Sequence, residues 1–159
     1  MEKAVFIDKD GTLVVDIPYN TDPDRIIFTE GALDALKMLK RQGYQLIVVS
    51  NQAGIAQGYF DEQALEKLKR SLLQKMQANG IMLDGFYVCP HHPDGKIPFY
   101  TMVCECRKPK PGMILTAAEK GNIDLSRSWM IGDILNDEEA GDKAGCKTIL
   151  LDNGNETEG

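Results

Sequence analysis

The sequence predicts an α/β fold in which a parallel sheet lies between helices on both of its faces. Short apolar runs alternate along the chain with longer segments of helical periodicity, which is the order that builds such a sheet. The chain has 159 residues, 43% of them hydrophobic, which is the usual size of one domain with its own core. No repeat or linker divides it, so we expect residues 1–159 to form a single domain.

Five apolar runs are predicted to be the strands. They are rich in branched aliphatic residues and are nearly continuous, as strands buried on both faces are. In chain order they are Ala4–Ile7, Leu46–Val49, Phe86–Val88, Trp129–Ile131 and Thr148–Leu151.

Four segments between these runs have the pattern of helices. Apolar residues recur every three to four positions before Gly43 and again before Gly80, and each glycine marks a helix end. A third helix is predicted to begin at Pro111 and to end near Gly121, and a fourth to span Asn136–Ala144. The segments 11–31 and 89–112 are too long and irregular to be simple connections, and such loops often carry function.

Charge and hydropathy exclude some classes of partner. The net charge of −6 repels a phosphodiester backbone, so we expect no nucleic-acid partner. No apolar stretch approaches the length that spans a bilayer, and no charged segment followed by an apolar run opens the chain. We therefore expect a cytoplasmic protein with no membrane partner.

Acidic side chains follow two of the predicted strands. Asp8 and Asp10 come after the first strand, and Asp133 comes after the fourth. Because parallel strands present their carboxyl ends at one edge of the sheet, these side chains should converge there. Clustered carboxylates repel one another unless a cation neutralises them, and Mg²⁺ prefers oxygen ligands and often shares them with phosphate. The sequence thus predicts a magnesium site at this edge.

The spacing of Asp8 and Asp10 suits phosphoryl transfer. One carboxylate can attack phosphorus, while a second, two residues on, can give a proton to the leaving group and then activate water. The alternative is an Asx turn that merely ends the strand, and an isolated D-x-D-G pattern would favour it. The presence of Ser50, Lys108 and Asp133 at their positions favours phosphoryl chemistry instead.

Four motifs resemble those of the haloacid dehalogenase (HAD) superfamily of phosphotransferases: DKDGTL, VVSNQ, CRKPKPGM and IGDILND. Longer stretches, SNQAGIAQGYF, YVCPHH and CECRKPKPGM, resemble the D-glycero-D-manno-heptose-1,7-bisphosphate phosphatases. The resemblance implies a Rossmann-like, three-layer HAD fold, and no insertion is large enough for a separate cap domain. It also implies a magnesium-dependent phosphomonoesterase that removes the C7 phosphate of the sugar bisphosphate through an aspartyl-phosphate intermediate.

The resemblance implies a role for each of five motif residues. Asp8 would be the nucleophile, and Asp10 the general acid and then the general base. Asp8 and Asp133 would bind Mg²⁺ through their carboxylates, and Asp10 through its backbone carbonyl. Ser50 and Lys108 would hold the phosphoryl group, which fits a reaction that depends on positioning and charge stabilisation.

Substrate contacts follow from the same resemblance. Asp16 and Tyr19 belong to a stretch that contacts substrate, and Asn51 and Gln52 follow Ser50 at the phosphoryl site. Arg107 matches a position that assists recognition, and its guanidinium is suited to gripping a second, non-reacting phosphate with two hydrogen bonds.

Four further positions are open or depart from the family pattern. Asp137 lies either behind the metal ligands or at the start of a helix that it caps, and both roles stay open. Lys9, between the two aspartates, is expected to point away from the metal and to matter little. Gln57 and Ile134 stand where relatives often have basic residues, which weakens the case for a bisphosphate substrate.

A cluster of sulfur and nitrogen ligands occupies the second long loop. It consists of a C-x-H pair and a C-x-C pair: Cys89, His91, Cys104 and Cys106. A closed site of this composition suits structural Zn²⁺, and the resemblance identifies His91 rather than His92 as the ligand. The alternative is a set of buried free thiols beside a surface histidine. Zinc would fold the loop and thereby place Lys108.

Three other functions share parts of the pattern. Histidinol-phosphate phosphatases resemble this chain in motifs and zinc site, but usually have a shorter segment between the two ligand pairs. A polynucleotide phosphatase is disfavoured by the acidic charge. A phospho-acceptor signalling module would share the fold and the acidic site, but should keep its phosphoryl group, whereas Asp10 can activate water to release it. We therefore expect a monomeric phosphatase that acts on a small phosphorylated metabolite.

Overall fold

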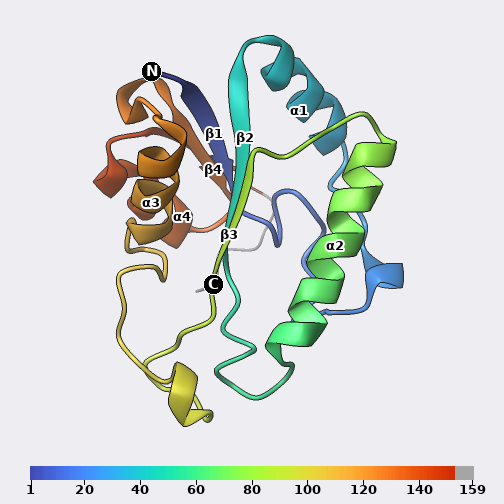
Figure 1. The fold of residues 1–159 in the computed structure, drawn as a ribbon, viewed down its shortest axis with the longest axis vertical. Helices are drawn as coiled ribbons and strands as arrows, with labels where there is room; N and C mark the ends of the chain where they lie inside the picture. The colour runs from blue at the N-terminus through green and yellow to red at the C-terminus, as the bar shows by residue number, and fades with distance from the viewer. Residues whose placement is uncertain (153–159) are drawn as a thin grey trace.

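In the computed structural model, which describes residues 1–152, five parallel strands form a sheet between two pairs of helices (Figure 1). The predicted α/β class is confirmed, and each predicted strand and helix overlaps an observed one. The strands are β1 (Lys3–Ile7), β2 (Tyr44–Asn51), β3 (Gly85–Cys89), β4 (Trp129–Gly132) and β5 (Lys147–Leu150). The helices are α1 (Ala32–Arg41), α2 (Glu62–Ala78), α3 (Gly112–Gly121) and α4 (Leu135–Ala144), with short 3₁₀ helices at Pro23–Arg25, Pro98–Tyr100 and Leu125–Arg127.

The strand order places a crevice beside the central strand. The order across the sheet is β3-β2-β1-β4-β5, so the chain moves outward from β1 in one direction and later returns to its other side. Ligands of such sheets bind at the carboxyl edge where the strand order reverses, which here lies between β1 and β4. Ile7 pairs with Ile131 at this edge, so the residues that follow the two strands meet.

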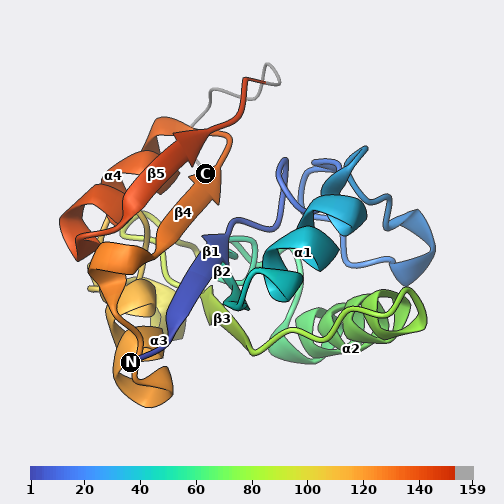
Figure 2. The ribbon, with the colours of Figure 1, turned by 90° about the horizontal axis from the view of Figure 1, so that it is seen from above.

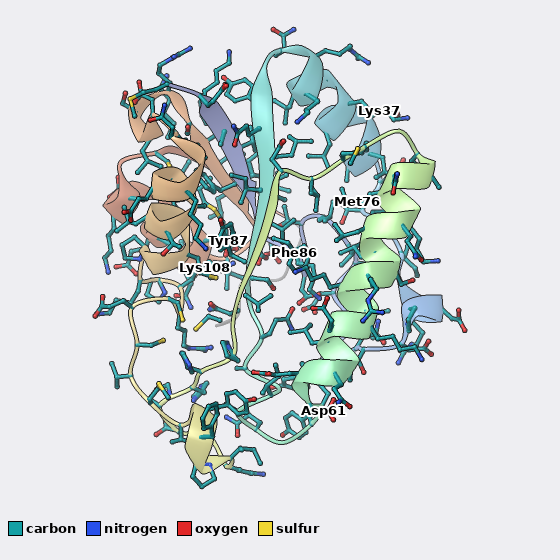
Figure 3. All side chains as sticks on the ribbon, in the orientation of Figure 1. Lys37, Asp61, Met76, Phe86, Tyr87 and Lys108 are labelled. Carbon is teal, nitrogen blue, oxygen red and sulfur yellow. The ribbon has the colours of Figure 1, made fainter. Side chains whose placement is uncertain are left out.

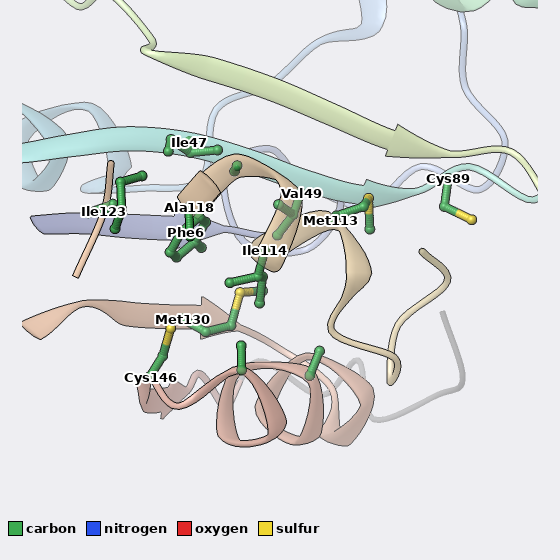
Figure 4. Close-up of a cluster of buried hydrophobic side chains, with 14 residues drawn as sticks. Phe6, Ile47, Val49, Cys89, Met113, Ile114, Ala118, Ile123, Met130 and Cys146 are labelled. Atoms are coloured by element: carbon green, nitrogen blue, oxygen red, sulfur yellow. The ribbon is translucent and has the colours of Figure 1, made fainter. Parts of the chain in front are cut away.

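Each face of the sheet is covered by one pair of helices. α1 and α2 lie on one face and α3 and α4 on the other (Figures 1 and 2). Neighbouring side chains of β3 therefore enter different layers: Phe86 packs on the α1/α2 side and Tyr87 on the α3/α4 side (Figure 3). On the α3/α4 side, Phe6, Ile114 and Met130 fill the space between the sheet and these helices (Figure 4). Two cores thus hold β1 and β2 rigidly.

The prediction that every strand is buried on both faces is wrong for the edge of the sheet. β1 and β2 are largely buried, whereas β5 has Lys147 exposed and leaves 41% of Ile149 accessible. The reason is that β5 has a neighbouring strand on one side only and pairs with β4 there. Within residues 1–152, no helix combines the length and apolar character that crossing a membrane requires.

Candidate active site

Three buried carboxylates and one buried lysine form the floor of the site at the carboxyl edge. The carboxylate oxygens of Asp8, Asp133 and Asp137 lie within 4.8 Å of one another. Lys108 Nζ donates to Asp8 Oδ1 at 2.7 Å, to Asp137 Oδ1 at 2.6 Å and to the Val49 carbonyl at 3.0 Å. In Figure 3, Lys108 lies close to the carboxyl ends of the strands. The fold therefore brings Asp8, Lys108 and Asp133 together, as the sequence predicted.

The charge balance of this floor calls for a cation. Three carboxylates face a single ammonium group, and all four side chains are almost fully buried. Burial raises the pKa of Asp8 well above its usual value, and the neighbouring Asp137 adds to this, although Lys108 opposes it. Burial alone would lower the pKa of Lys108, but Asp8 and Asp137 together raise it. Mg²⁺ fits this donor set, because a hard divalent cation would keep the carboxylates ionised.

Asp137 caps α4, which is one of the two roles that the sequence left open. Its Oδ2 accepts hydrogen bonds from the backbone N–H groups of Asp133, at 3.1 Å, and Ile134, at 3.3 Å, and so caps α4. Its Oδ1 pairs with Lys108 behind the cluster. Gly132 makes this approach possible, since a Cβ atom at that position would lie 2.2 Å from the Asp137 side chain. Asp137 thus orients both Asp133 and Lys108.

Asn51 fixes the backbone of Lys108. Its Oδ1 accepts from the Lys108 N–H at 2.9 Å, and its Nδ2 donates to the Lys108 carbonyl at 3.1 Å. The amide predicted to contact substrate is thus mainly engaged with the protein. Ser50 is 1% exposed and is not among the residues that line the cavity, and its hydroxyl donates to Gln52 Oε1 at 2.9 Å. To hold a phosphoryl oxygen, the Ser50 hydroxyl must turn away from Gln52.

A cavity of about 370 Å³ lies above this floor. Residues predicted to act in catalysis or recognition line it, namely Asp8, Asp10, Asp16, Tyr19, Asn51, Gln52, Arg107, Lys108 and Asp133. Its wall also contains Asn20 and His92, which the sequence analysis did not assign to the site. In the sequence, Asn20 directly follows Tyr19 and His92 directly follows His91, and this adjacency to predicted site residues could have identified them.

Two loops meet at the cavity through aromatic rings. Tyr19 has a left-handed backbone, with φ of 55°, and its ring centroid lies 4.4 Å from that of Tyr59. Asp16 lines the cavity nearby, and its pKa is raised by burial and by the charges of Asp10 and Asp133. The β1–α1 loop and the loop after β2 thus form one wall for a substrate.

Lys9, predicted to point away from the metal and to matter little, lies outside the main cavity but contacts Asp10. Its side chain is 4% exposed, and its Nζ lies 2.8 Å from Asp10 Oδ1. The Asp10 side chain is 34% exposed and lines the main cavity. The turn around it closes on itself, because the Lys9 carbonyl accepts from the N–H groups of Leu13 and Val14 at 3.0 Å. Lys9 therefore contacts the side chain to which the sequence assigned proton transfer.

The sulfur and nitrogen ligands of the second loop converge as predicted. Sγ of Cys104 lies 3.5 Å from Sγ of both Cys89 and Cys106, while His91 Nδ1 lies 3.7 Å from Cys89 and 3.4 Å from Cys106. The edge of a tetrahedron with Zn–S bonds of about 2.3 Å is roughly 3.8 Å, so this cage fits Zn²⁺. Hydrogen bonding between the two thiols lowers the pKa of Cys106 to about 5 and raises the pKa of Cys89 well above its usual value, so one proton is shared within the cluster.

Comparisons with known proteins agree with this geometry. A family model described as HAD-hydrolase-like matches residues 105–159. The chain is 45% identical over 151 residues to the D-glycero-beta-D-manno-heptose-1,7-bisphosphate 7-phosphatase of Pasteurella multocida, covering 95% of this chain and 82% of that protein.

Two solved structures share the fold. One is a putative HAD-like phosphatase from Mesorhizobium loti, with a TM-score of 0.90 and 36% identity over 95% of this chain and 73% of that one. The other is the D,D-heptose 1,7-bisphosphate phosphatase of B. bronchiseptica, complexed with magnesium and phosphate. It has a TM-score of 0.81 and 32% identity over 93% of this chain and 79% of that one.

Proposed function

Because this chain belongs to the HAD-like phosphatase family that includes the D-glycero-beta-D-manno-heptose-1,7-bisphosphate 7-phosphatases, we propose that it removes the 7-phosphate from such a heptose bisphosphate. The observation that carries the proposal is the buried cluster of Asp8, Asp133, Asp137 and Lys108 at the foot of a polar cavity. It combines a nucleophile, a cation site and a fixed positive charge, which are the elements that phosphoryl transfer requires.

In the first step, an Asp8 carboxylate oxygen attacks phosphorus. The new O–P bond forms as the bond between phosphorus and the sugar oxygen breaks, and Asp10 gives that oxygen its proton. Lys108 lies 2.7 Å from Asp8 Oδ1 and neutralises charge beside the reacting group. Bound to the Asp8 and Asp133 carboxylates and the Asp10 carbonyl, Mg²⁺ would supply positive charge for the phosphoryl oxygens.

In the second step, water releases the phosphoryl group from Asp8. Asp10, now ionised, takes a proton from the water while the water oxygen bonds to phosphorus and the Asp8 O–P bond breaks. Inorganic phosphate leaves, and Asp10 is protonated for the next cycle. The second step separates this protein from a signalling module, because it needs a base beside the phosphorylated aspartate.

The non-reacting phosphate would bind at Arg107. Among the described residues that line the cavity, Arg107 and Lys108 are the only lysine or arginine side chains, and Lys108 is held by Asp8 and Asp137. Arg107 lies in the cavity wall, and its planar guanidinium is suited to binding a second phosphate through paired hydrogen bonds. The neutral polar groups of Asn20 and Gln57 suit sugar hydroxyls.

Zinc would have a structural role in this proposal. Its four ligands leave no open position for chemistry, and their loop leads directly to Arg107 and Lys108. Folding of the loop around the ion would therefore place the phosphate-binding side chains rather than take part in the reaction.

A panel of phosphate esters tests the proposal. With Mg²⁺ present, we expect the highest kcat/KM for one anomer of heptose 1,7-bisphosphate, followed by fructose 1,6-bisphosphate and histidinol phosphate. Asp8→Asn should abolish both turnover and protein phosphorylation, and it serves as the control for contaminating phosphatases. A clear preference for histidinol phosphate would overturn the substrate, and a stable phosphoprotein without turnover would overturn the phosphatase reaction.

A further inference from the structure

A buried lysine, Lys9, lies beside the catalytic aspartates, and its side chain is only 4% exposed. Lys9 borders a small cavity of about 20 Å³ whose wall includes Leu68 and Leu72 of α2 and Val14. Burial of an ammonium group in such surroundings is costly unless the charge is paired. The charge therefore needs an explanation that the packing does not supply.

The partner of this charge is Asp10. Lys9 Nζ donates to Asp10 Oδ1 at 2.8 Å, and Asp10 lines both the main cavity and the small one. A carboxylate bonded through one oxygen to a buried, nearly immobile lysine loses much of its rotational freedom. Its second oxygen takes no part in this hydrogen bond and is available for proton transfer.

We propose that Lys9 is a positioning residue that holds the Asp10 carboxylate in the orientation required for proton transfer. The proposal rests on the phosphatase function proposed above, because it assigns Lys9 a role through Asp10. The geometry supports it in two ways. The Lys9 backbone is fixed by hydrogen bonds from Leu13 and Val14, and its side chain is enclosed, so that Nζ has a defined position relative to Asp10.

A purely structural role makes a different prediction. If Lys9 only fills space, its replacement changes the fraction of folded protein and slows all substrates equally. If it positions Asp10, the effect depends on the leaving group, because an alkoxide needs a proton as it departs whereas p-nitrophenolate does not. The second step, in contrast, needs Asp10 for every substrate.

The test compares Lys9→Met and Lys9→Arg, with Lys67→Met as a control that removes an exposed lysine of α2. For a sugar phosphate, we expect Lys9→Met to lower kcat by roughly 10- to 100-fold, with KM changed less than about 2-fold. This is less than the roughly 10²- to 10⁴-fold that general acid–base catalysis supplies, because Asp10 itself stays in place. Lys9→Arg, which keeps the charge, should retain most activity, and Lys67→Met should behave as wild type.

Rapid-quench measurements with p-nitrophenyl phosphate separate the two steps. In Lys9→Met we expect formation of phosphorylated Asp8 at nearly the wild-type rate, followed by its accumulation. Equal slowing of phosphoenzyme formation for both leaving groups, or unchanged turnover, would overturn the proposal. The ratio of the phosphorylation rates for the two leaving groups is measured within one preparation and does not depend on the folded fraction. If Lys9→Met does not fold, Lys9→Gln takes its place. If the wild type itself turns over none of these phosphate esters, the proposed phosphatase function is overturned instead.

Discussion

Asp137→Asn is the substitution that tests the buried floor most directly. The side chain is fully buried, and its two oxygens accept from Lys108 on one side and from the N–H groups of Asp133 and Ile134 on the other. Asparagine has almost the same shape but only one acceptor oxygen. Its NH₂ group must face either the Lys108 ammonium or the backbone N–H groups, and both are donors.

The expected cost follows from these contacts. Loss of a buried, charge-assisted hydrogen bond costs about 1.5–3 kcal/mol, and removal of one partner of a buried ion pair costs about 3–5 kcal/mol. Relief of the repulsion between Asp137 and Asp8 offsets part of this, so we expect a loss of about 2–4 kcal/mol in the free energy of unfolding. For a protein of this size, each kcal/mol lowers Tm by about 2–4 °C.

The assay combines urea unfolding with steady-state kinetics. Asp142→Asn is the matched control, because it makes the same change at an exposed position of the same helix. We expect Asp137→Asn to lower kcat more than it raises KM, since Lys108 loses its support beside the reacting group. A change in unfolding free energy below about 0.5 kcal/mol together with an unchanged kcat would refute the interpretation of Asp137 as the support of Lys108.

Three other perturbations test separate parts of the structure. Removal of zinc with a strong chelator is expected to expose the three clustered thiols to a maleimide, while the buried Cys146 stays unlabelled. Mass spectrometry counts the labels, and identical labelling before and after chelation would argue against the metal cage. Gly132→Ala should cost about 1–3 kcal/mol in urea unfolding, since its Cβ would meet Asp137 at 2.2 Å, and an unchanged midpoint would contradict that contact. Burial raises the pKa of Cys146 from 9.0 to about 11, so the folded state keeps the thiol proton that the unfolded state loses first. The stability of the wild type relative to Cys146→Ala should therefore decline as the pH rises from 9 to 11, and a constant difference would count against the burial of this thiol.

Much of the fold was predictable because its signals are local. Continuous apolar runs predict buried strands, periodic apolar residues predict helices, and glycines mark where the helices end. The rule that parallel strands present their carboxyl ends at one edge then predicted the meeting of Asp8 and Asp133. The exposure of Ile149 was not predictable in the same way, because an edge strand and a central strand differ in their neighbours rather than in their composition.

The supporting contacts of the site depend on tertiary approach and leave little trace in the sequence. Lys108 meets Asp8 across 100 positions of the chain, and its backbone meets Asn51 across 57. An asparagine beside a phosphate site is expected to contact the substrate, and nothing in its surroundings along the chain indicates that its amide is engaged elsewhere. The contact between Lys9 and Asp10 was not predictable either, because the sequence does not show how a side chain is enclosed in the folded protein.

The zinc cage and the phosphoryl site are connected through backbone contacts. Gln52, which follows β2, donates its N–H to the carbonyl of Cys89, a predicted zinc ligand, at 2.8 Å. Asn51 binds the backbone of Lys108, two residues after the predicted ligand Cys106. The ends of β2 and β3 and the metal loop therefore form one unit. Loss of zinc should accordingly lower kcat through displacement of Lys108, while the carboxylates that follow β1 and β4 keep their places. Protein without zinc is thus expected to retain Mg²⁺ binding while losing turnover, a combination that a catalytic role for zinc would not require.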